Sequence, residues 1–325
     1  MKVKVLAVFS GGLDSIIAVK IVQEQGIDVL GITFETPFFS SQKARDAAEK
    51  IGLPLIVLDI TKEHLQMLMS PRYGYGKNLN PCIDCHTLML KIAGGKMNEL
   101  GADFIITGEV LGQRPMSQGK QMLSVVAKNS GFPDYILRPL SAKLLPETKP
   151  EREGKIKRQQ LLDIQGRGRK IQIMLAEHYG IFDYAPPAGG CLLTDPMFTK
   201  RLKDLFNHKK DFRIRDIELL KFGRHFRIDE KTKIVVGRNK VDNEAIQKLA
   251  ETNDATIFMS SFRGPIVLVP EAGNSEILNI AATLCASYSD APKDRVVEAI
   301  CTSGSKTLHL DIIAAPRENI TRWMI

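Results

Sequence analysis

The sequence of 325 residues contains one tryptophan, five cysteines and no apolar run of membrane-spanning length. A transmembrane helix needs about 20 consecutive apolar residues. No basic segment with a small-residue cleavage site precedes the first apolar run, so a signal peptide is not expected. Five cysteines make a poor disulfide framework for a chain of this length. We therefore expect a cytoplasmic protein with no membrane partner.

The charge is unevenly distributed along the chain. The formal net charge is +8, and most of this excess falls within Glu151–Arg227. A basic segment between better-balanced ones points to a polyanionic partner, with nucleic acid as the first candidate. A solvated, lysine-rich surface would give the same composition, and charge alone does not separate these two interpretations.

The N-terminal half alternates short apolar strands with amphipathic helices. Strand-like runs at Val3–Phe9, Ile27–Glu35 and Pro54–Ile60 are separated by helical patterns, and "ADFIITG" and "DYILRPL" continue the series. This alternation predicts an α/β fold with a doubly wound parallel sheet that helices cover on both faces.

The pattern changes near residue 150. Pro139–Pro150 interrupts the alternation, and "APPAGG" (Ala185–Gly190) predicts a rigid loop before Cys191. We expect a first domain at residues 1–150, a basic linker segment carrying the third cysteine at 151–215, and a second, smaller α+β domain at 216–325.

The strand-to-helix turn "VLAVFSGGLDS" indicates an anion site. A glycine-rich turn between a strand and a helix gathers backbone N–H groups at the positive helix end, which suits a phosphate group. Ser10–Ser15 is not a Walker A loop, because no Gly-Lys-Ser/Thr follows. The carboxylate of Asp14 near phosphates makes sense if Mg²⁺ bridges it to pyrophosphate.

"SGGLDS" resembles the signature of the PP-loop ATP pyrophosphatases, an α/β family with a HUP-like fold. The resemblance implies that the turn binds the pyrophosphate part of ATP, that "GITF" receives the adenine, and that the enzyme adenylates a carbonyl oxygen. The residues implied for ATP are Ser10, Gly11, Gly12, Leu13, Asp14 and Ser15, together with Thr33, Phe34, Gly108 and Gln113.

Two cysteines stand in "NPCIDCH". We expect Cys82 and Cys85 in a loop just before a helix at Thr87–Leu100, on the edge of the sheet where ligands bind. A helix N-terminus lowers a thiol pKa, which suits either a nucleophile or a metal ligand. The motif resembles the "NPxxxCN" of the tRNA 2-thiouridylases, with His86 in place of the asparagine.

"TGEVLGQRPMSQ" and the following "LRPL" resemble the tRNA 4-thiouridine synthetases, whose pattern is close to "TGESLGQVASQ". Arg114, Pro115 and Met116 depart from that pattern, and the following residues match it: Gly108, Glu109, Gly112, Gln113, Ser117 and Gln118. Both resemblances imply tRNA thiolation and differ over which uridine position is modified; the second is slightly preferred.

Cys191 supplies a third thiol. Cys82, Cys85 and Cys191 with one open position suit a [4Fe-4S] cluster that binds a sulfide on its unique iron, as in cluster-dependent tRNA thiolases, and we prefer this interpretation. The alternative is persulfide chemistry that ends in a disulfide. A structural zinc site with His86 is a third interpretation. Haem c attachment, which "CIDCH" also spells, is set aside for want of an export signal.

The C-terminal segment "HFRIDEKTKIVVGRNKVDNEAI" resembles the NFACT-R domain, whose hallmark is close to "KIxVGRNxxxNE". The resemblance implies RNA binding by residues 216–325, with Arg238 among the contacts. A dimerisation or capping domain is the alternative.

The basic segment adds candidate phosphate contacts, which would position tRNA without reading its sequence. They are Arg152, Lys155, Lys157, Arg158, Arg167, Arg169 and Lys170. "GRGRKIQ" could instead bring Arg167 or Arg169 to the phosphates of ATP.

Together these features predict an ATP-dependent tRNA sulfurtransferase with Asp14, Cys82, Cys85 and Cys191 as catalytic residues. ATP, Mg²⁺ and the cluster are the expected cofactors. Its partners would be tRNA and a sulfur donor, either a cysteine desulfurase or sulfide, and a homodimer is one form considered. The alternatives are a PP-loop enzyme that sulfurates a small molecule and a non-catalytic RNA-binding protein with a relict ATP site.

Overall fold

The computed structural model describes residues 2–114, 116–184 and 190–325. These divide into two compact units, Met1–Thr194 and Asp195–Ile325. The segment expected as a linker is shared between them: residues 151–184 and 190–194 pack as part of the first unit and 195–215 as part of the second. All of the expected rigid loop except Gly190 lies outside the described residues.

The first unit is built on a five-stranded sheet in the order β3-β2-β1-β4-β5, in which every pairing is parallel. This confirms the predicted α/β fold. The strands are β1 (Lys4–Val8), β2 (Asp28–Glu35), β3 (Leu55–Asp59), β4 (Phe104–Thr107) and β5 (Ile136–Leu137). The strand order reverses between β1 and β4, and the carboxyl ends at such a switch point are where open α/β sheets bind ligands.

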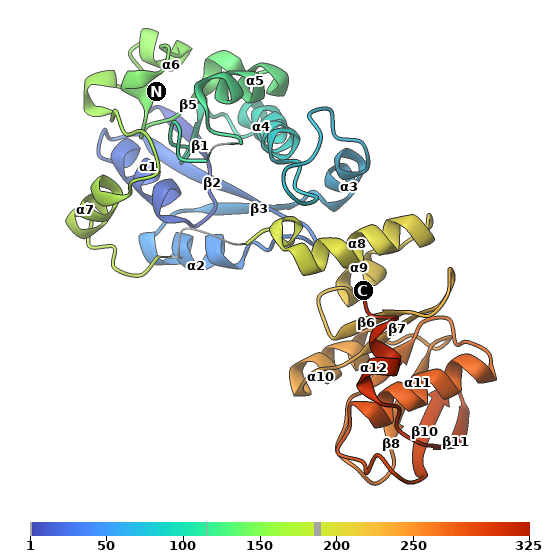
Figure 1. Ribbon diagram of the computed structural model, residues 1–325. Helices are drawn as coiled ribbons and strands as arrows, with labels where there is room; N and C mark the ends of the chain where they lie inside the picture. Colours follow the sequence, from blue (N-terminus) through green and yellow to red (C-terminus); the bar gives the residue numbers. More distant parts are fainter. Residues whose placement is uncertain (1, 115, 185–189) are drawn as a thin grey trace. The chain divides into compact units, whose positions relative to one another are not determined.

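Helices cover both faces of this sheet (Figure 1). They are α1 (Leu13–Gln23), α2 (Gln42–Ile51), α3 (Thr61–Met69), α4 (Cys82–Glu99), α5 (Lys120–Ser130), α6 (Lys149–Arg152) and α7 (Lys170–His178). One core lies between the sheet and α1, α2 and α7, and includes Phe9, Ile17 and Phe104. A second core lies on the opposite face, where Leu90, Ala93 and Met97 of α4 pack.

Three local expectations are corrected. The helix expected from Thr87 starts five residues earlier, with Pro81 at its N-cap, so both cysteines of "CIDC" are helical; proline is tolerated there because no intrahelical partner awaits its missing N–H. β5 keeps only two residues of "DYILRPL". The basic residues 151–180, whose sequence predicts a helix interrupted at "GRGR", are largely irregular between α6 and α7.

The second unit is the expected smaller α+β domain. Its six-stranded sheet has the order β11-β10-β8-β9-β7-β6, with antiparallel pairings throughout. The strands are β6 (Arg224–Arg227), β7 (Lys233–Val236), β8 (Ala255–Met259), β9 (Val267–Val269), β10 (Val297–Ser303) and β11 (Lys306–Ile312). The helices are α8 (Pro196–His208), α9 (Ile214–Leu219), α10 (Lys240–Leu249), α11 (Ser275–Ser287) and α12 (Arg317–Thr321).

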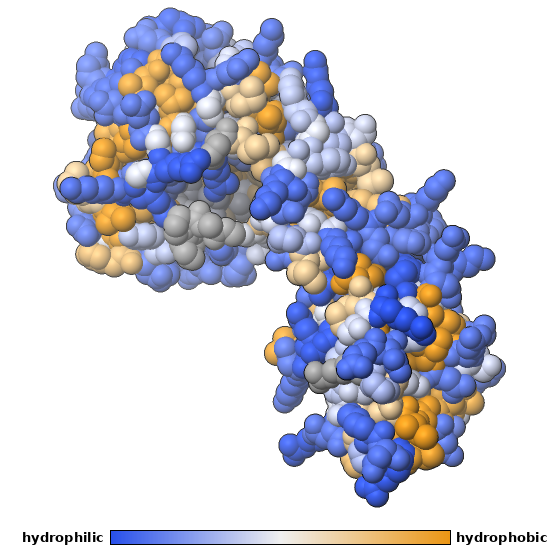
Figure 2. All heavy atoms as spheres, in the orientation of Figure 1, coloured by the Kyte–Doolittle hydropathy of each residue, from blue (hydrophilic) through white to orange (hydrophobic). Residues whose placement is uncertain are grey.

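The core of the second unit forms where α11 packs on the sheet. Ala281, Cys285 and Cys301 are buried there, and the two cysteines pack as small apolar side chains. The visible face of each unit is mainly hydrophilic and is broken by scattered apolar patches (Figure 2). Among the described residues, no helix combines the length and apolar character that crossing a bilayer requires.

Candidate active site

The turn after β1 leaves the first N–H groups of α1 without side-chain partners. Gly12 is the N-cap of α1 and no side chain caps the helix. The hydroxyl of Ser15 donates to the carbonyl of Gly12 at 2.8 Å, and the amide of Gly12 donates to the hydroxyl of Ser10 at 3.4 Å. A helix N-terminus left open in this way is a ready site for a phosphate group.

Two glycines let the backbone come close around this turn. Gly11 has φ +72°, and a Cβ on it would lie 2.2 Å from the carbonyl oxygen of Lys43. Gly108, just after β4, packs against the turn: a Cβ there would lie 2.5 Å from the amide nitrogen of Ser15. Only glycine fits either position without moving the neighbouring backbone.

One carboxylate oxygen of Asp14 accepts a hydrogen bond, and the other has no hydrogen-bond partner. Nε2 of Gln113 donates to Oδ2 of Asp14 at 3.1 Å. Oδ1 of Asp14 is buried and has no hydrogen-bond partner in the structure. A buried carboxylate oxygen without a partner requires an explanation, and it is the type of ligand that Mg²⁺ prefers. Asp14 therefore fits the magnesium site expected from the sequence.

Cys82 and Cys85 project from the first turn of α4. The side-chain amide of Asn80 donates to Sγ of Cys82 at 3.3 Å. Both carboxylate oxygens of Asp84 accept backbone N–H groups, from Arg72 at 3.2 Å and Tyr73 at 3.0 Å, and so fasten the preceding loop to the helix start.

Cys191 is brought to the same place by two long-range hydrogen bonds. The amide of Leu192 donates to the carbonyl of Phe38, in the loop after β2, at 2.9 Å. The side-chain amide of Asn78 donates to the carbonyl of Thr194 at 2.8 Å. These bonds hold the third cysteine against two loops at the carboxyl edge of the sheet.

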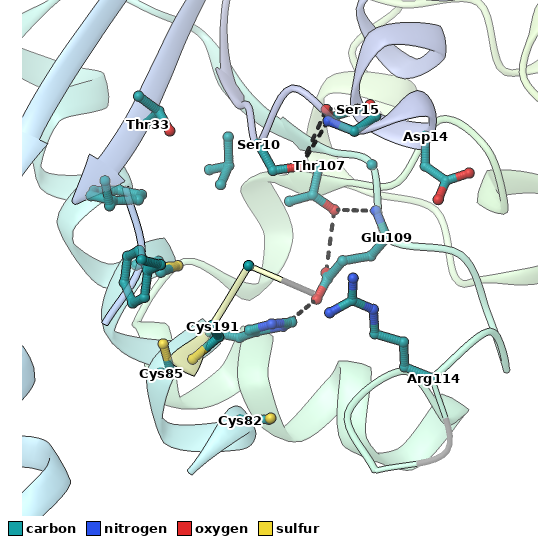
Figure 3. A pocket seen from close by; sticks show the side chains of 18 of the residues that line it. Ser10, Asp14, Ser15, Thr33, Cys82, Cys85, Thr107, Glu109, Arg114 and Cys191 are labelled. Carbon is teal, nitrogen blue, oxygen red and sulfur yellow. Dashed lines mark hydrogen bonds and ion pairs between the residues drawn. The ribbon is translucent and has the colours of Figure 1, made fainter. Parts of the chain in front are cut away.

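The turn and the three thiols line one pocket of about 400 Å³. Figure 3 shows the sulfur atoms on one side of this pocket and Ser10 and Ser15 on the other. The remaining residues expected at the ATP site that line it are Gly12, Leu13, Asp14, Thr33, Phe34, Gly108 and Gln113. Gly11 supports the turn from behind, against the backbone of α2.

The thiols differ from the expectation in their ionisation. Burial raises the pKa of Cys85 far above its usual range, and the nearby Cys191 and Cys82 raise it further. Burial likewise raises the pKa of Cys191 to about 11, against a smaller lowering by the Arg114 guanidinium. The expectation of a lowered pKa at the helix start is therefore wrong for Cys85, because loss of hydration outweighs the helix dipole.

The metal sites expected at the thiols stay predictions. Among the described residues, no three His, Cys, Asp or Glu side chains are placed as ligands of one metal ion. The three thiols share a pocket, and a [4Fe-4S] cluster would bind each of them through a different iron.

A buried ionic network forms the floor of the pocket and was not recognised as such from the sequence. Glu109 accepts from Nε of Arg138 at 2.9 Å and contacts Nδ1 of His86 at 3.0 Å; Thr107 donates to the same carboxylate at 3.2 Å. Burial would raise the pKa of Glu109, but Arg138 and His86 outweigh it and lower that pKa to about 2. The sequence signals were Glu109 in "TGEVLGQ", the arginine of "LRPL" and His86, and nothing in their spacing showed that the three meet.

Comparison with known proteins finds relatives for both ends of the chain. Residues 1–143 match the family model described as "Thiamine biosynthesis protein (ThiI)", and residues 223–324 match "NFACT protein RNA binding domain". The chain is also 37% identical over 127 residues to a tRNA-specific 2-thiouridylase MnmA of Clostridium acetobutylicum, over 33% of this chain and 36% of that protein. The N-terminal part of the chain is thus similar to ThiI and to the tRNA-specific 2-thiouridylases, and the C-terminal part is similar to the NFACT RNA-binding domain.

Other relatives also match about half of this chain or less than two thirds of it. The 2-thiouridylase of Symbiobacterium thermophilum is 27% identical over 45% of this chain and 43% of its own length. The chain thus spans a third to a half of the length of the curated relatives it matches. A solved 4-thiouridine synthetase–RNA complex with bound ATP gives a TM-score of 0.37 at 23% identity, over 59% of this chain and 45% of the other.

Three of the seven basic residues expected to contact RNA have partners within the first unit. Arg158 contacts the buried carboxylate of Glu151 at 2.6 Å, and Lys155 contacts Asp103 at 2.7 Å. Arg152 donates to the carbonyl of Glu147 at 2.6 Å. Their role as RNA contacts stays a prediction; two more of the set are exposed to solvent, Lys157 and Lys170.

Arg167 and Arg169 lie beside the nucleotide turn rather than with the other basic residues. Together with Asp14, Gln113 and Arg114 they line a second pocket of about 180 Å³, and Arg169 also lines the first. Their loop is anchored by the amide of Gly166, which donates to the carbonyl of Leu111 at 2.7 Å. The structure therefore places these two arginines beside the nucleotide turn, the second position considered from the sequence.

In the second unit, the NFACT-R hallmark residues mostly support the fold. The side chain of Asn239 caps α10 by accepting from the amide of Asp242 at 2.9 Å. Asn243 accepts from the amide of Ile266 at 3.0 Å, and Arg238 donates to Asp242 at 2.6 Å. Arg238 keeps 42% of its side chain exposed, so its expected contact with RNA stays a prediction.

Proposed function

We propose that the chain is an ATP-dependent tRNA sulfurtransferase that replaces a uridine carbonyl oxygen with sulfur. The observation that carries this is the shared pocket: Asp14 and the glycine turn on one side, and Cys82, Cys85 and Cys191 on the other. Such a pocket can activate an oxygen and deliver sulfur without moving the substrate between sites.

The first step would be adenylation. The uridine oxygen attacks the α-phosphorus of ATP, an O–P bond forms, and the bond to the β-phosphate breaks as pyrophosphate leaves with the electron pair. The open N–H groups of α1 and the hydroxyl of Ser10 would bind the phosphates. Mg²⁺, held by Oδ1 of Asp14, would supply neutralisation of the phosphate charge.

The second step would transfer sulfur. The persulfide form of this step starts from a cysteine persulfide, supplied by a cysteine desulfurase or by sulfide with an oxidant; the cluster route stays the other candidate. The terminal sulfur attacks the activated carbon, a C–S bond forms, and AMP leaves with the oxygen. A second cysteine then attacks the inner sulfur, releasing the thiouridine and leaving a disulfide that an external dithiol reduces.

Sulfur transfer requires a thiolate, and the thiols of Cys85 and Cys191 are protonated at neutral pH in the free protein. The pKa of Cys191 is raised to about 11, so a base or an incoming cation must accompany thiolate formation. Residues of the second unit are proposed to bind the tRNA, and a cytoplasmic location and a homodimer remain predictions.

The deciding experiment combines nucleoside mass spectrometry with point variants. Purified protein is incubated with ATP, Mg²⁺, a persulfide donor and unmodified tRNA, and the digested tRNA is searched for thiouridines. We expect a thiouridine with the wild type and none with Cys191→Ala. The matched control is Cys301→Ala, a buried thiol of the second unit, which should keep the activity. Wild-type protein that makes no thiouridine would contradict the proposal.

The two alternatives give other results. A small-molecule sulfurtransferase would form AMP from ATP without any need for tRNA. A non-catalytic RNA-binding protein would bind tRNA and release neither AMP nor pyrophosphate. The iron–sulfur route is checked on anaerobically purified protein, by its iron content and visible absorption.

A further inference from the structure

Three arginines gather beside the nucleotide turn without acidic partners of their own. Arg114 follows Gln113 in the loop after β4, and Arg167 and Arg169 precede α7. Within the part of the chain that the structure describes, none of the three forms an ion pair with a carboxylate. Like charges held together repel one another, so such a cluster indicates an anionic ligand.

Backbone contacts hold together the two loops that form the second pocket. The amide of Gly166 donates to the carbonyl of Leu111, and residues Leu111 and Gln165 pair as a parallel bridge. Gly112, at φ +74°, lies against Gly166: a Cβ on Gly112 would be 3.5 Å from the amide nitrogen of Gly166. These contacts hold the two arginine-bearing loops side by side.

Two residues that line this pocket each have a buried side-chain atom without a hydrogen-bond partner. These atoms are Oδ1 of Asp14 and Nε of Arg169. A metal cation would satisfy the first and an anionic oxygen the second. A magnesium-bound phosphate supplies both groups at once, whereas a single RNA phosphate on the surface would have no use for the carboxylate of Asp14.

We propose that Arg114, Arg167 and Arg169 form a pyrophosphate clamp that takes the β- and γ-phosphates of ATP and retains the pyrophosphate product. This rests on the proposed function and deepens it. As the α–β bond breaks, negative charge grows on the leaving pyrophosphate, and guanidinium groups at fixed positions compensate it.

The clamp belongs to this chain rather than to the signature of its family. Arg114 stands where "RPM" departs from the 4-thiouridine synthetase pattern, and Arg167 and Arg169 lie beyond residues 1–143, the part that matches the family model. Two of the three were first assigned to a tRNA-binding strip, so the test must separate a nucleotide role from an RNA role.

The test is titration calorimetry of the full chain with inorganic pyrophosphate and Mg²⁺, a measurement that needs neither tRNA nor sulfur. We expect Arg167→Gln with Arg169→Gln to weaken pyrophosphate binding by about 10- to 100-fold, and Arg114→Gln by about 10-fold, as loss of charge-assisted hydrogen bonds would give. Binding of tRNA, measured by filter retention, should change less than twofold.

The matched control removes two charges from the same basic segment, outside the pocket. Arg152→Gln with Lys157→Gln should leave pyrophosphate affinity unchanged. Arg169→Lys, which keeps the charge and loses the planar fork, should fall between wild type and Arg169→Gln. Unaltered melting temperatures show that the variants are folded.

Two results would overturn the clamp. One is unchanged pyrophosphate affinity in the double variant with weaker tRNA binding, which would return these arginines to an RNA surface. The other is a wild-type protein that binds no pyrophosphate. Failure of the proposed function has a separate signature, since a protein that makes no thiouridine can still bind pyrophosphate through these residues.

Discussion

Gln113 donates a hydrogen bond to Asp14 at 3.1 Å and so joins the loop after β4 to the turn after β1. The two residues are far apart in sequence. Each follows one of the two strands, β1 and β4, between which the strand order reverses. The bond fixes one oxygen of the carboxylate and leaves the other, Oδ1, for a cation.

Asp14→Asn should abolish adenylation while the protein stays folded. The amide can still accept from Gln113, but it offers a metal ion no charge, so AMP release should fall by at least about 100-fold. Gln113→Ala should cost less, on the order of 10-fold, because it only loosens the carboxylate. Release of AMP measured by chromatography checks both; equal losses for the two variants would contradict the assignment of Asp14 as metal ligand.

Gly108→Ala should destabilise the first unit and weaken ATP binding together. The added Cβ would lie 2.5 Å from the amide nitrogen of Ser15, so β4 or the nucleotide turn must shift. We expect a loss of about 1–3 kcal/mol in the free energy of unfolding. The measurement is urea unfolding, with equilibrium ATP binding on the same samples.

The matched control for that prediction is Gly95→Ala in the exposed middle of α4. Nothing lies within 4 Å of the position of its Cβ, so replacing glycine in a helix should stabilise the protein by about 0.5–1 kcal/mol. If Gly108→Ala proves as harmless as this, the close packing of β4 on the turn is not important for stability.

Cys85→Ala should leave ATP binding intact and abolish thiouridine formation. The half-buried thiol lies on the side of the pocket opposite the nucleotide turn (Figure 3), so its removal leaves the phosphate contacts untouched. Calorimetry with an ATP analogue and mass spectrometry of the tRNA separate the two effects. A variant that still makes thiouridine at the wild-type rate would exclude Cys85 from the sulfur step.

Glu109 should make the stability of the first unit depend on acid pH. Its folded-state pKa of about 2 lies below the ordinary value of 4.5, so its ion pairs stabilise the fold fully above about pH 4.5. This contribution is lost as the pH falls toward 2, because the unfolded chain takes up the proton first.

The comparison variant is Glu109→Gln, which cannot lose a charge in acid. At pH 7 it should be less stable than the wild type by roughly 2–4 kcal/mol, since Arg138 is left buried without its carboxylate. The difference between the two proteins should shrink between pH 4.5 and 2. Urea unfolding across this range measures it; a difference that does not vary with pH would show that Glu109 is not ionised in the fold.

Local sequence patterns predicted much of the secondary structure of the first unit. The alternation of apolar strands and amphipathic helices gave the parallel sheet, and "SGGLDS" marked the turn by its glycines and by its place between strand and helix. The start of α4 was misplaced because Pro81 read as a loop residue, whereas a proline N-cap leads directly into the helical Cys82 and Cys85.

What the sequence by itself determined is therefore local: which segments fold as strands and helices, and which turn is able to hold phosphate. Only the tertiary structure decided that Cys191 meets the other two thiols, that Glu109 lies between Arg138 and His86, and that Arg167 and Arg169 face Asp14. Each of these depends on hydrogen bonds and burial between residues distant along the chain. Periodicity and motif spacing report neighbours within an element and carry no information on which loops meet.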